Sequence, residues 1–128
     1  MTRATWLSLS LALLIAPACG GTPGAGGAGG GDGGPACPND LPPRCPSPAP
    51  TWANDVAGIV AARCASCHAP DGAAAEKPLT SYAEVFKLRS AVLNQVHACK
   101  MPQAGAPELT PTERAALQAW LVCGAIDD

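Results

Sequence analysis

The sequence Cys64-Ala65-Ser66-Cys67-His68 decides how the rest of the chain is interpreted. Two cysteines and a histidine at positions i, i+3 and i+4 fall on one side of a helical turn. Cys-x-x-Cys-His is the attachment sequence of c-type haem, in which two thioether bonds hold the porphyrin beside an iron-binding histidine. The motif therefore predicts one covalent haem c on Cys64 and Cys67, with His68 as an axial ligand of the iron.

Other chemistries use similar cysteine spacings. A zinc site would combine Cys64, Cys67 and His68 with His97 or Cys99, but exported proteins rarely keep free zinc thiolates. A thioredoxin-like motif needs an adjoining βαβ pattern, which the sequence does not show. A structural disulfide between the two motif cysteines would give the histidine no role. Haem attachment accounts for all three residues, so we prefer it.

A six-coordinate haem iron needs a second axial ligand. Met101 is the only methionine after the initiator, and a thioether is a common partner of histidine on cytochrome iron. His97, four residues earlier, is the alternative ligand. Basic side chains could pair with the haem propionates, although lone basic residues are usually just solvated; the candidates are Arg63, Arg89 and Lys100.

The N-terminus predicts export. One arginine precedes an apolar run over residues 7–16, too short to span a bilayer, and Ala16-Pro17-Ala18 resembles a signal-peptidase site. Residues 1–18 are therefore a predicted signal peptide. Cys19 follows directly, as in bacterial lipoproteins, although that motif usually has leucine where Ala16 stands. With seven cysteines, two on haem and four able to pair, Cys19 is the odd one, so we predict that it carries lipid. Cleavage without lipidation is the alternative.

Residues 19–50 are predicted to form a disordered linker rich in glycine and proline. Residues 20–34 contain ten glycines and cannot bury enough apolar area to fold, whereas the proline-rich part after them should be extended and stiff. Cys37 and Cys45 bracket a short loop there. We expect them to bond to each other, with a bond from either one to the folded domain as the alternative.

Residues 51–128 are predicted to form a small all-α domain. Apolar side chains recur at helical spacing from about residue 51 to the motif. Ser81 and Thr110 each begin a capping-box sequence, and Gly124 stands where the last helix should end. The segment after Ser81 is read as one helix to Ala98 or as two short helices. Net charge is −2 with no basic stripe, which argues against nucleic acid as a partner.

Taken together, these residues resemble the class I cytochrome c family, and more closely the compact c-type domains of bacterial lipoproteins such as those of myxobacteria and planctomycetes. The resemblance covers residues 52–125 and includes Met101-Pro102 and the closing helix. It implies that the last helix crosses the first, with Val60 facing Leu117 and Trp120. Met101 lies only 33 residues after His68, which is short for the family.

The resemblance implies electron transfer rather than enzymatic catalysis, with redox proteins as partners and a membrane reached through Cys19. It also implies a periplasmic or cell-surface location. Cys99 and Cys123 are extra to the family pattern, and we predict a disulfide between them that ties the methionine loop to the last helix. The alternative functions are a haem-based sensor of small ligands, and a zinc or structural lipoprotein without haem.

Overall fold

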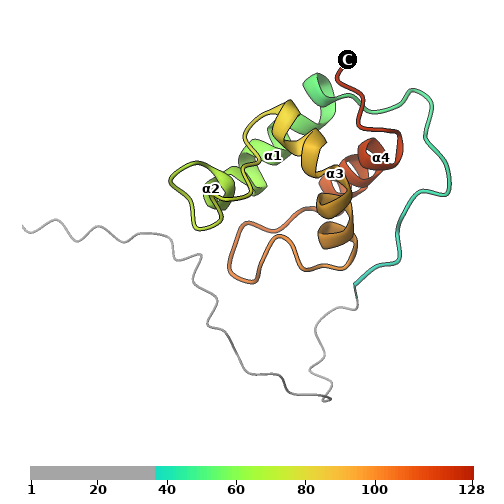
Figure 1. The fold of residues 1–128 in the computed structure, drawn as a ribbon. Helices are drawn as coiled ribbons and strands as arrows, with labels where there is room; N and C mark the ends of the chain where they lie inside the picture. The colour runs from blue at the N-terminus through green and yellow to red at the C-terminus, as the bar shows by residue number, and fades with distance from the viewer. Residues whose placement is uncertain (1–36) are drawn as a thin grey trace, which may run out of the picture.

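The computed structural model describes residues 37–128. The predicted signal peptide (1–18), Cys19 and the glycine-rich part of the linker lie outside the described residues. Over residues 37–128 the regular secondary structure is helical throughout, which confirms the all-α class, and it consists of a π-helical turn η1 (Trp52–Val56), α1 (Ala57–Arg63), α2 (Ala65–His68), α3 (Tyr82–His97) and α4 (Pro111–Val122). Figure 1 shows η1, α1 and α2 as one nearly continuous path, with α3 and α4 packed beside it.

The predicted helix boundaries are confirmed where the sequence carries a local signal. The Ser81 and Thr110 hydroxyls accept from the backbone N–H groups of Glu84 and Glu113, and each glutamate closes its capping box in return. The segment after Ser81 is one helix of 16 residues, not two. Gly124, with φ at +90°, follows α4 in the left-handed conformation that glycine adopts at low cost.

The core is small and lies where α4 meets η1 and α3. Val60, Leu117 and Trp120, which the family resemblance places at a helix crossing, belong to one buried cluster. The Trp120 ring packs 5.6 Å from that of Trp52 and its Nε1 donates to the Ile126 carbonyl oxygen at 2.7 Å. The Trp52 amide also donates to the Ile126 carbonyl oxygen, so the two ends of the helical domain are joined.

Residues 37–50, which we call the strap, differ from the predicted disordered linker. They contain no helix but cross the outside of the domain before η1, as the teal segment of Figure 1 shows. Asp40 in the strap forms an ion pair with Arg114 of α4, with Nε and Oδ2 2.7 Å apart. The strap is therefore part of the folded domain, which begins before the predicted boundary at residue 51.

Both predicted disulfides are wrong. We expected Cys37–Cys45 and Cys99–Cys123, whereas the structure has Cys37–Cys99 and Cys45–Cys123, with Cα separations of 5.8 and 5.1 Å. Because the strap runs along the domain, each of its cysteines meets the end of a different helix. The alternative of a bond to the folded domain is what the structure shows, and it occurs twice.

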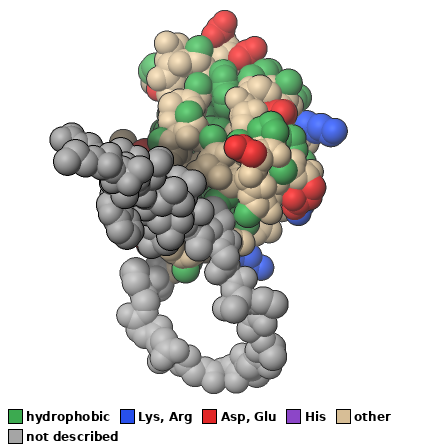
Figure 2. Space-filling view, turned by 90° about the vertical axis from the view of Figure 1, so that its left-hand side faces the viewer, with side chains coloured by type: hydrophobic (Ala, Val, Ile, Leu, Met, Phe, Trp, Pro, Cys, Tyr) green, Lys and Arg blue, Asp and Glu red, His purple; other side chains and the backbone are tan. Residues whose placement is uncertain are grey.

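The surface of the domain is mixed. Figure 2 shows hydrophobic side chains spread over the visible part of one face, with charged side chains scattered mainly toward its edges. Among residues 37–128, no helix is both long enough and apolar enough to cross a bilayer.

Candidate haem site

The attachment motif occupies a helical turn, as its spacing predicts. Cys64 precedes α2, and its carbonyl oxygen accepts from the backbone N–H groups of Cys67 and His68 at 3.1 and 3.0 Å. These bonds hold positions i, i+3 and i+4 on one side of the turn. The turn thereby places Cys64, Cys67 and His68 in the order that attachment of one porphyrin edge requires. Cys67 is disulfide-bonded in this structure, so its sulfur has to be reduced before it can bond to a porphyrin.

His68 is held in the tautomer that binds a metal ion. Its Nδ1 lies 2.7 Å from the carbonyl oxygen of Lys77, a hydrogen bond that only a protonated Nδ1 can donate. The lone pair is then on Nε2, and a backbone partner of this kind orients a metal-binding histidine and raises its basicity. The backbone N–H of Leu79 also donates to the His68 carbonyl oxygen at 3.2 Å. The loop before α3 therefore fixes the ring.

Cys64 lies in apolar surroundings. It packs against the core cluster, and its burial raises the pKa of the thiol to about 11. A thiol with this pKa is protonated at neutral pH in the metal-free protein, so it is a slow nucleophile. The apolar contacts of Cys64 are compatible with an uncharged thioether.

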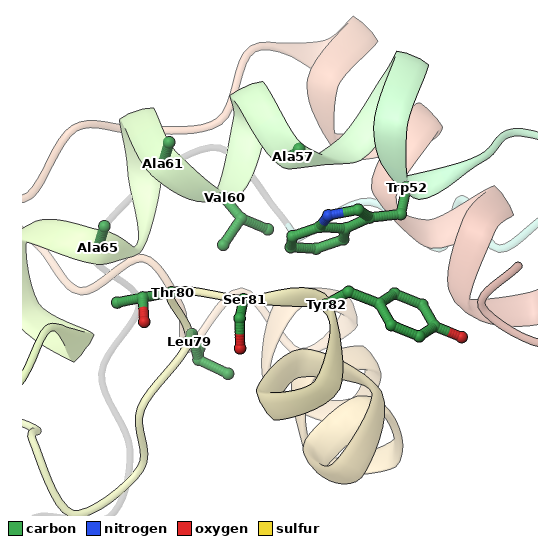
Figure 3. A pocket seen from close by; sticks show the side chains of 9 residues that line it. All are labelled: Trp52, Ala57, Val60, Ala61, Ala65, Leu79, Thr80, Ser81 and Tyr82. Atoms are coloured by element: carbon green, nitrogen blue, oxygen red, sulfur yellow. The ribbon is translucent and has the colours of Figure 1, made fainter. Parts of the chain in front are cut away.

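A cavity of about 350 Å³ lies beside the attachment turn. In Figure 3 it separates α1 from the chain that leads into α3, with Trp52 and Val60 on one side and Leu79 on the other. Ala57 and Ala61 of α1 and Ala65 of α2 form one wall, on a face adjacent to the one that carries Cys64 and His68. None of the four predicted haem residues lines it, so the haem site is argued from the turn and not from this cavity.

Met101 follows α3 in a turn that its own backbone helps to close. The N–H groups of Lys100 and Met101 donate to the Gln95 carbonyl oxygen at 2.9 and 3.2 Å, and Cys99 donates to that of Val96 at 3.0 Å. Cys99 has φ at +52°, which makes this the left-handed helix end usually formed by glycine. These contacts fix Met101 to the end of α3 and His68 to the loop before α3, and none of them joins the two side chains.

A family model described as cytochrome c oxidase, cbb3-type, subunit III matches residues 52–121, more than half of the 128-residue chain. The chain belongs to this family. No curated protein and no solved structure matches it. The match identifies a c-type cytochrome domain, which implies covalently bound haem c and electron transfer to redox partner proteins. Cys64 before α2, together with Cys67 and His68 within it, fits that cofactor.

The cytochrome domain does not support the zinc alternative. No group of three or more histidine, cysteine and acidic side chains in residues 37–128 is placed to hold a metal ion. Cys99 is bonded to Cys37, and the Nε2 of His97 lies 3.3 Å from the Asn39 side-chain oxygen of the strap. Both residues proposed to complete a zinc site with the motif are therefore engaged elsewhere.

Two of the three candidate propionate partners are also engaged within the cytochrome domain. The guanidinium of Arg63 forms hydrogen bonds of 2.9–3.1 Å with the carboxylate of Glu113, and that of Arg89 lies 4.2 Å above the centre of the Phe86 ring. Arg63 thereby links the residue before Cys64 to the start of α4. Within residues 37–128, the Lys100 side chain has no hydrogen bond, ion pair or ring contact, so its predicted role as a propionate partner stays a prediction.

Sequence reasoning missed three residues around the cytochrome site. The Lys77 carbonyl orients His68 through its backbone, which no side-chain motif reveals. Gly72 packs its Cα against the backbone of Cys67, so a Cβ there would come within 2.2 Å of the Cys67 carbonyl oxygen. Arg114 is buried on α4, and the signal for it was present, since it occupies a position on the same helical stripe as Leu117 and Leu121.

Proposed function

We propose that this protein is an exported, lipid-anchored cytochrome that carries single electrons through one haem c. Cys64 and Cys67 would form the thioethers, and His68 and Met101 would bind the iron. The bound haem would supply an iron that cycles between ferric and ferrous states. The observation that carries the proposal is the attachment turn, with the His68 Nδ1 held by the Lys77 carbonyl oxygen.

The choice of Met101 over His97 rests on the strap. His97 is the last residue of α3, and its ring contacts Asn39 of the strap. Met101 is held beyond the end of the same helix by backbone hydrogen bonds to Gln95. A thioether ligand raises the reduction potential relative to a second histidine, which suits an electron carrier at the oxidising end of a redox chain.

The proposal excludes an enzymatic reaction at the iron. With one histidine and one methionine bound, the iron has no open position for oxygen, peroxide or substrate. The protein's residues orient the imidazole and hold the thioether ligand. Soluble or membrane-bound redox proteins at the periplasmic or cell-surface side would be the partners.

The lipid anchor is proposed from cysteine pairing. Cys37, Cys45, Cys99 and Cys123 form two disulfides with one another. Haem on Cys64 and Cys67 requires that Cys67, which is disulfide-bonded in this structure, is first reduced; Cys19, directly after the predicted signal peptide, is then the seventh cysteine. Lipid on Cys19 would place the domain at a membrane surface.

The axial ligands can be tested by spectroscopy of the mature protein. Oxidised wild-type protein should show the weak far-red band of sulfur-to-iron charge transfer. Met101→Ala should remove that band and allow the ferrous form to bind carbon monoxide, while His97→Ala should keep the wild-type spectrum. A band that survives in Met101→Ala but disappears in His97→Ala would refute the ligand assignment. Rapid binding of carbon monoxide by the wild type would instead favour the sensor alternative.

A further inference from the structure

The last turn of α3, which precedes Met101, accepts hydrogen bonds from a buried arginine side chain. Arg114 of α4 is 8% exposed, and its guanidinium donates to the Val96 carbonyl oxygen and, at 3.1 Å, to that of His97. These carbonyls belong to the last turn of α3, and that of Val96 accepts from the Cys99 N–H group as well as from Arg114. Arg114 therefore ties the last turn of α3 to α4.

The same guanidinium also binds the strap. Its Nε and Nη2 donate to the two carboxylate oxygens of Asp40 at 2.7 and 3.1 Å, which is a bidentate pair. Nη2 further lies 3.5 Å from the Pro38 carbonyl oxygen. Asp40 neutralises the buried charge of Arg114 and fixes the plane of its guanidinium. The N–H groups that donate to the end of α3 are therefore held in one orientation.

A covalent bond closes the assembly next to the methionine. Cys37, three residues before Asp40, is bonded to Cys99, two residues before Met101. Cys99 is held in the left-handed conformation, which costs free energy for a residue with a side chain. The strap, α4 and the last turn of α3 thus meet at Arg114 and at this disulfide. Met101 follows Cys99 by two residues, so it lies close to this junction in the sequence.

We propose that Arg114 is a positioning residue for the Met101 ligand: through the Val96 and His97 carbonyls, and braced by Asp40, it holds the turn from which Met101 reaches the iron. The inference rests on the proposed haem function. An iron–thioether bond is weak, so its occupancy depends on how tightly the surrounding chain confines the sulfur. A neutral or shorter side chain at 114 frees the α3 end and increases the fraction of iron without its methionine.

The test uses mature haem protein with Arg114→Gln, Arg114→Lys and Asp40→Asn. Three quantities are measured on each: haem per chain, the far-red band of the ferric form, and the rate at which the ferrous form binds carbon monoxide. Because thioether bonds do not depend on the methionine, haem per chain should stay unchanged. Arg114→Gln should weaken the far-red band and bind carbon monoxide about tenfold faster or more, because the competent fraction scales the apparent rate. Arg114→Lys and Asp40→Asn should lie between it and the wild type.

Two controls separate positioning from general stability. The double variant Cys45→Ala/Cys123→Ala removes a disulfide remote in sequence from Met101, and Arg44→Gln removes an exposed arginine of the strap. The disulfide variant should melt at a lower temperature than the wild type, and the arginine variant at the same or a lower temperature. Both should keep the far-red band and the carbon monoxide rate of the wild type. If the controls lose the band to the same extent as Arg114→Gln, the role of Arg114 is merely structural and the inference fails.

Every outcome is decisive. Folded Arg114→Gln protein with the wild-type band and carbon monoxide rate overturns the inference. If circular dichroism shows that Arg114→Gln does not fold, Asp40→Asn takes its place. A wild-type rate of carbon monoxide binding in Asp40→Asn would then overturn the inference. Wild-type protein without haem would overturn the proposed function itself, which is a different failure from unaltered ligation in a haem-bearing variant.

Discussion

At the scale of single residues, the loop that follows the attachment turn depends on the absence of a side chain. The Ala74 N–H donates to the Cys67 carbonyl oxygen at 2.8 Å, and Gly72 approaches the same carbonyl. The loop then leads to Lys77, whose carbonyl oxygen holds His68. The orientation of the proposed iron ligand therefore depends on a close backbone approach as well as on the motif that the sequence displays.

Gly72→Ala should destabilise the domain. The added Cβ would lie 2.2 Å from the Cys67 carbonyl oxygen, so the backbone has to move. We expect the free energy of unfolding to fall by about 1–3 kcal/mol, as for other overpacked sites. Denaturant unfolding of the mature protein measures this change.

Gly58→Ala is the matched control. Gly58 lies in α1 with nothing within 4 Å of its added Cβ, and alanine is the better helix former by about 0.5–1 kcal/mol. This variant should equal or exceed the wild type in stability. Equal effects of the two substitutions would contradict the close approach at Gly72.

At the scale of helices and turns, the elements that the sequence predicted are those with local signals. Both capping boxes and the Gly124 terminus depend on residues within one turn of each other, so their patterns suffice. The disulfides join residues that are at least 62 positions apart in the sequence. Arg114 contacts residues that are at least 17 positions away. Cysteine spacing carries no information about the path of the strap, which is why both pairings were mispredicted.

The capping boxes should make stability fall in acid. Hydrogen bonds from Thr80 hold the pKa of Glu84 below its ordinary value of 4.5, and the Arg63 side chain does the same for Glu113. Carboxyls whose pKa is lowered by folding stabilise the native state above the unfolded-state pKa, and that stabilisation is lost as pH falls through the folded-state value. The free energy of unfolding should therefore decline below about pH 4.5.

The slope identifies the residue. Glu113→Gln cannot change charge, so its stability should decline less steeply in acid than that of the wild type, with unfolding followed by circular dichroism from pH 7 to 3. Identical acid slopes in the two proteins would show that the contact between Arg63 and Glu113 does not contribute.

At the scale of the whole molecule, the domain has a small hydrophobic core and is cross-linked by disulfides and an ion pair. Trp120 and Leu117 are its largest fully buried apolar side chains, and both lie on α4. The strap adds two disulfides and an ion pair on the outside, and the family implies a covalent cofactor on the attachment turn. Small domains commonly compensate for a limited core with cross-links and bound groups.

Removing Cys45–Cys123 should cost stability without changing the haem ligands. The bond closes a chain segment with a sequence separation of 78, and loss of a native disulfide typically lowers the free energy of unfolding by about 2–5 kcal/mol. Thermal unfolding of Cys45→Ala/Cys123→Ala beside the wild type measures the loss. A melting temperature that does not fall would show that the strap adds no stability through this bond.

The central claim is that Cys64 and Cys67 carry a covalent haem. The most direct measurement is a pyridine-haemochrome spectrum together with the intact mass of protein expressed with a haem-attachment system, compared with Cys64→Ser/Cys67→Ser. The wild type should give a c-type haemochrome and the added mass of one haem after denaturation, while the double variant should give neither. A colourless wild-type protein whose mass lacks the porphyrin would contradict the account.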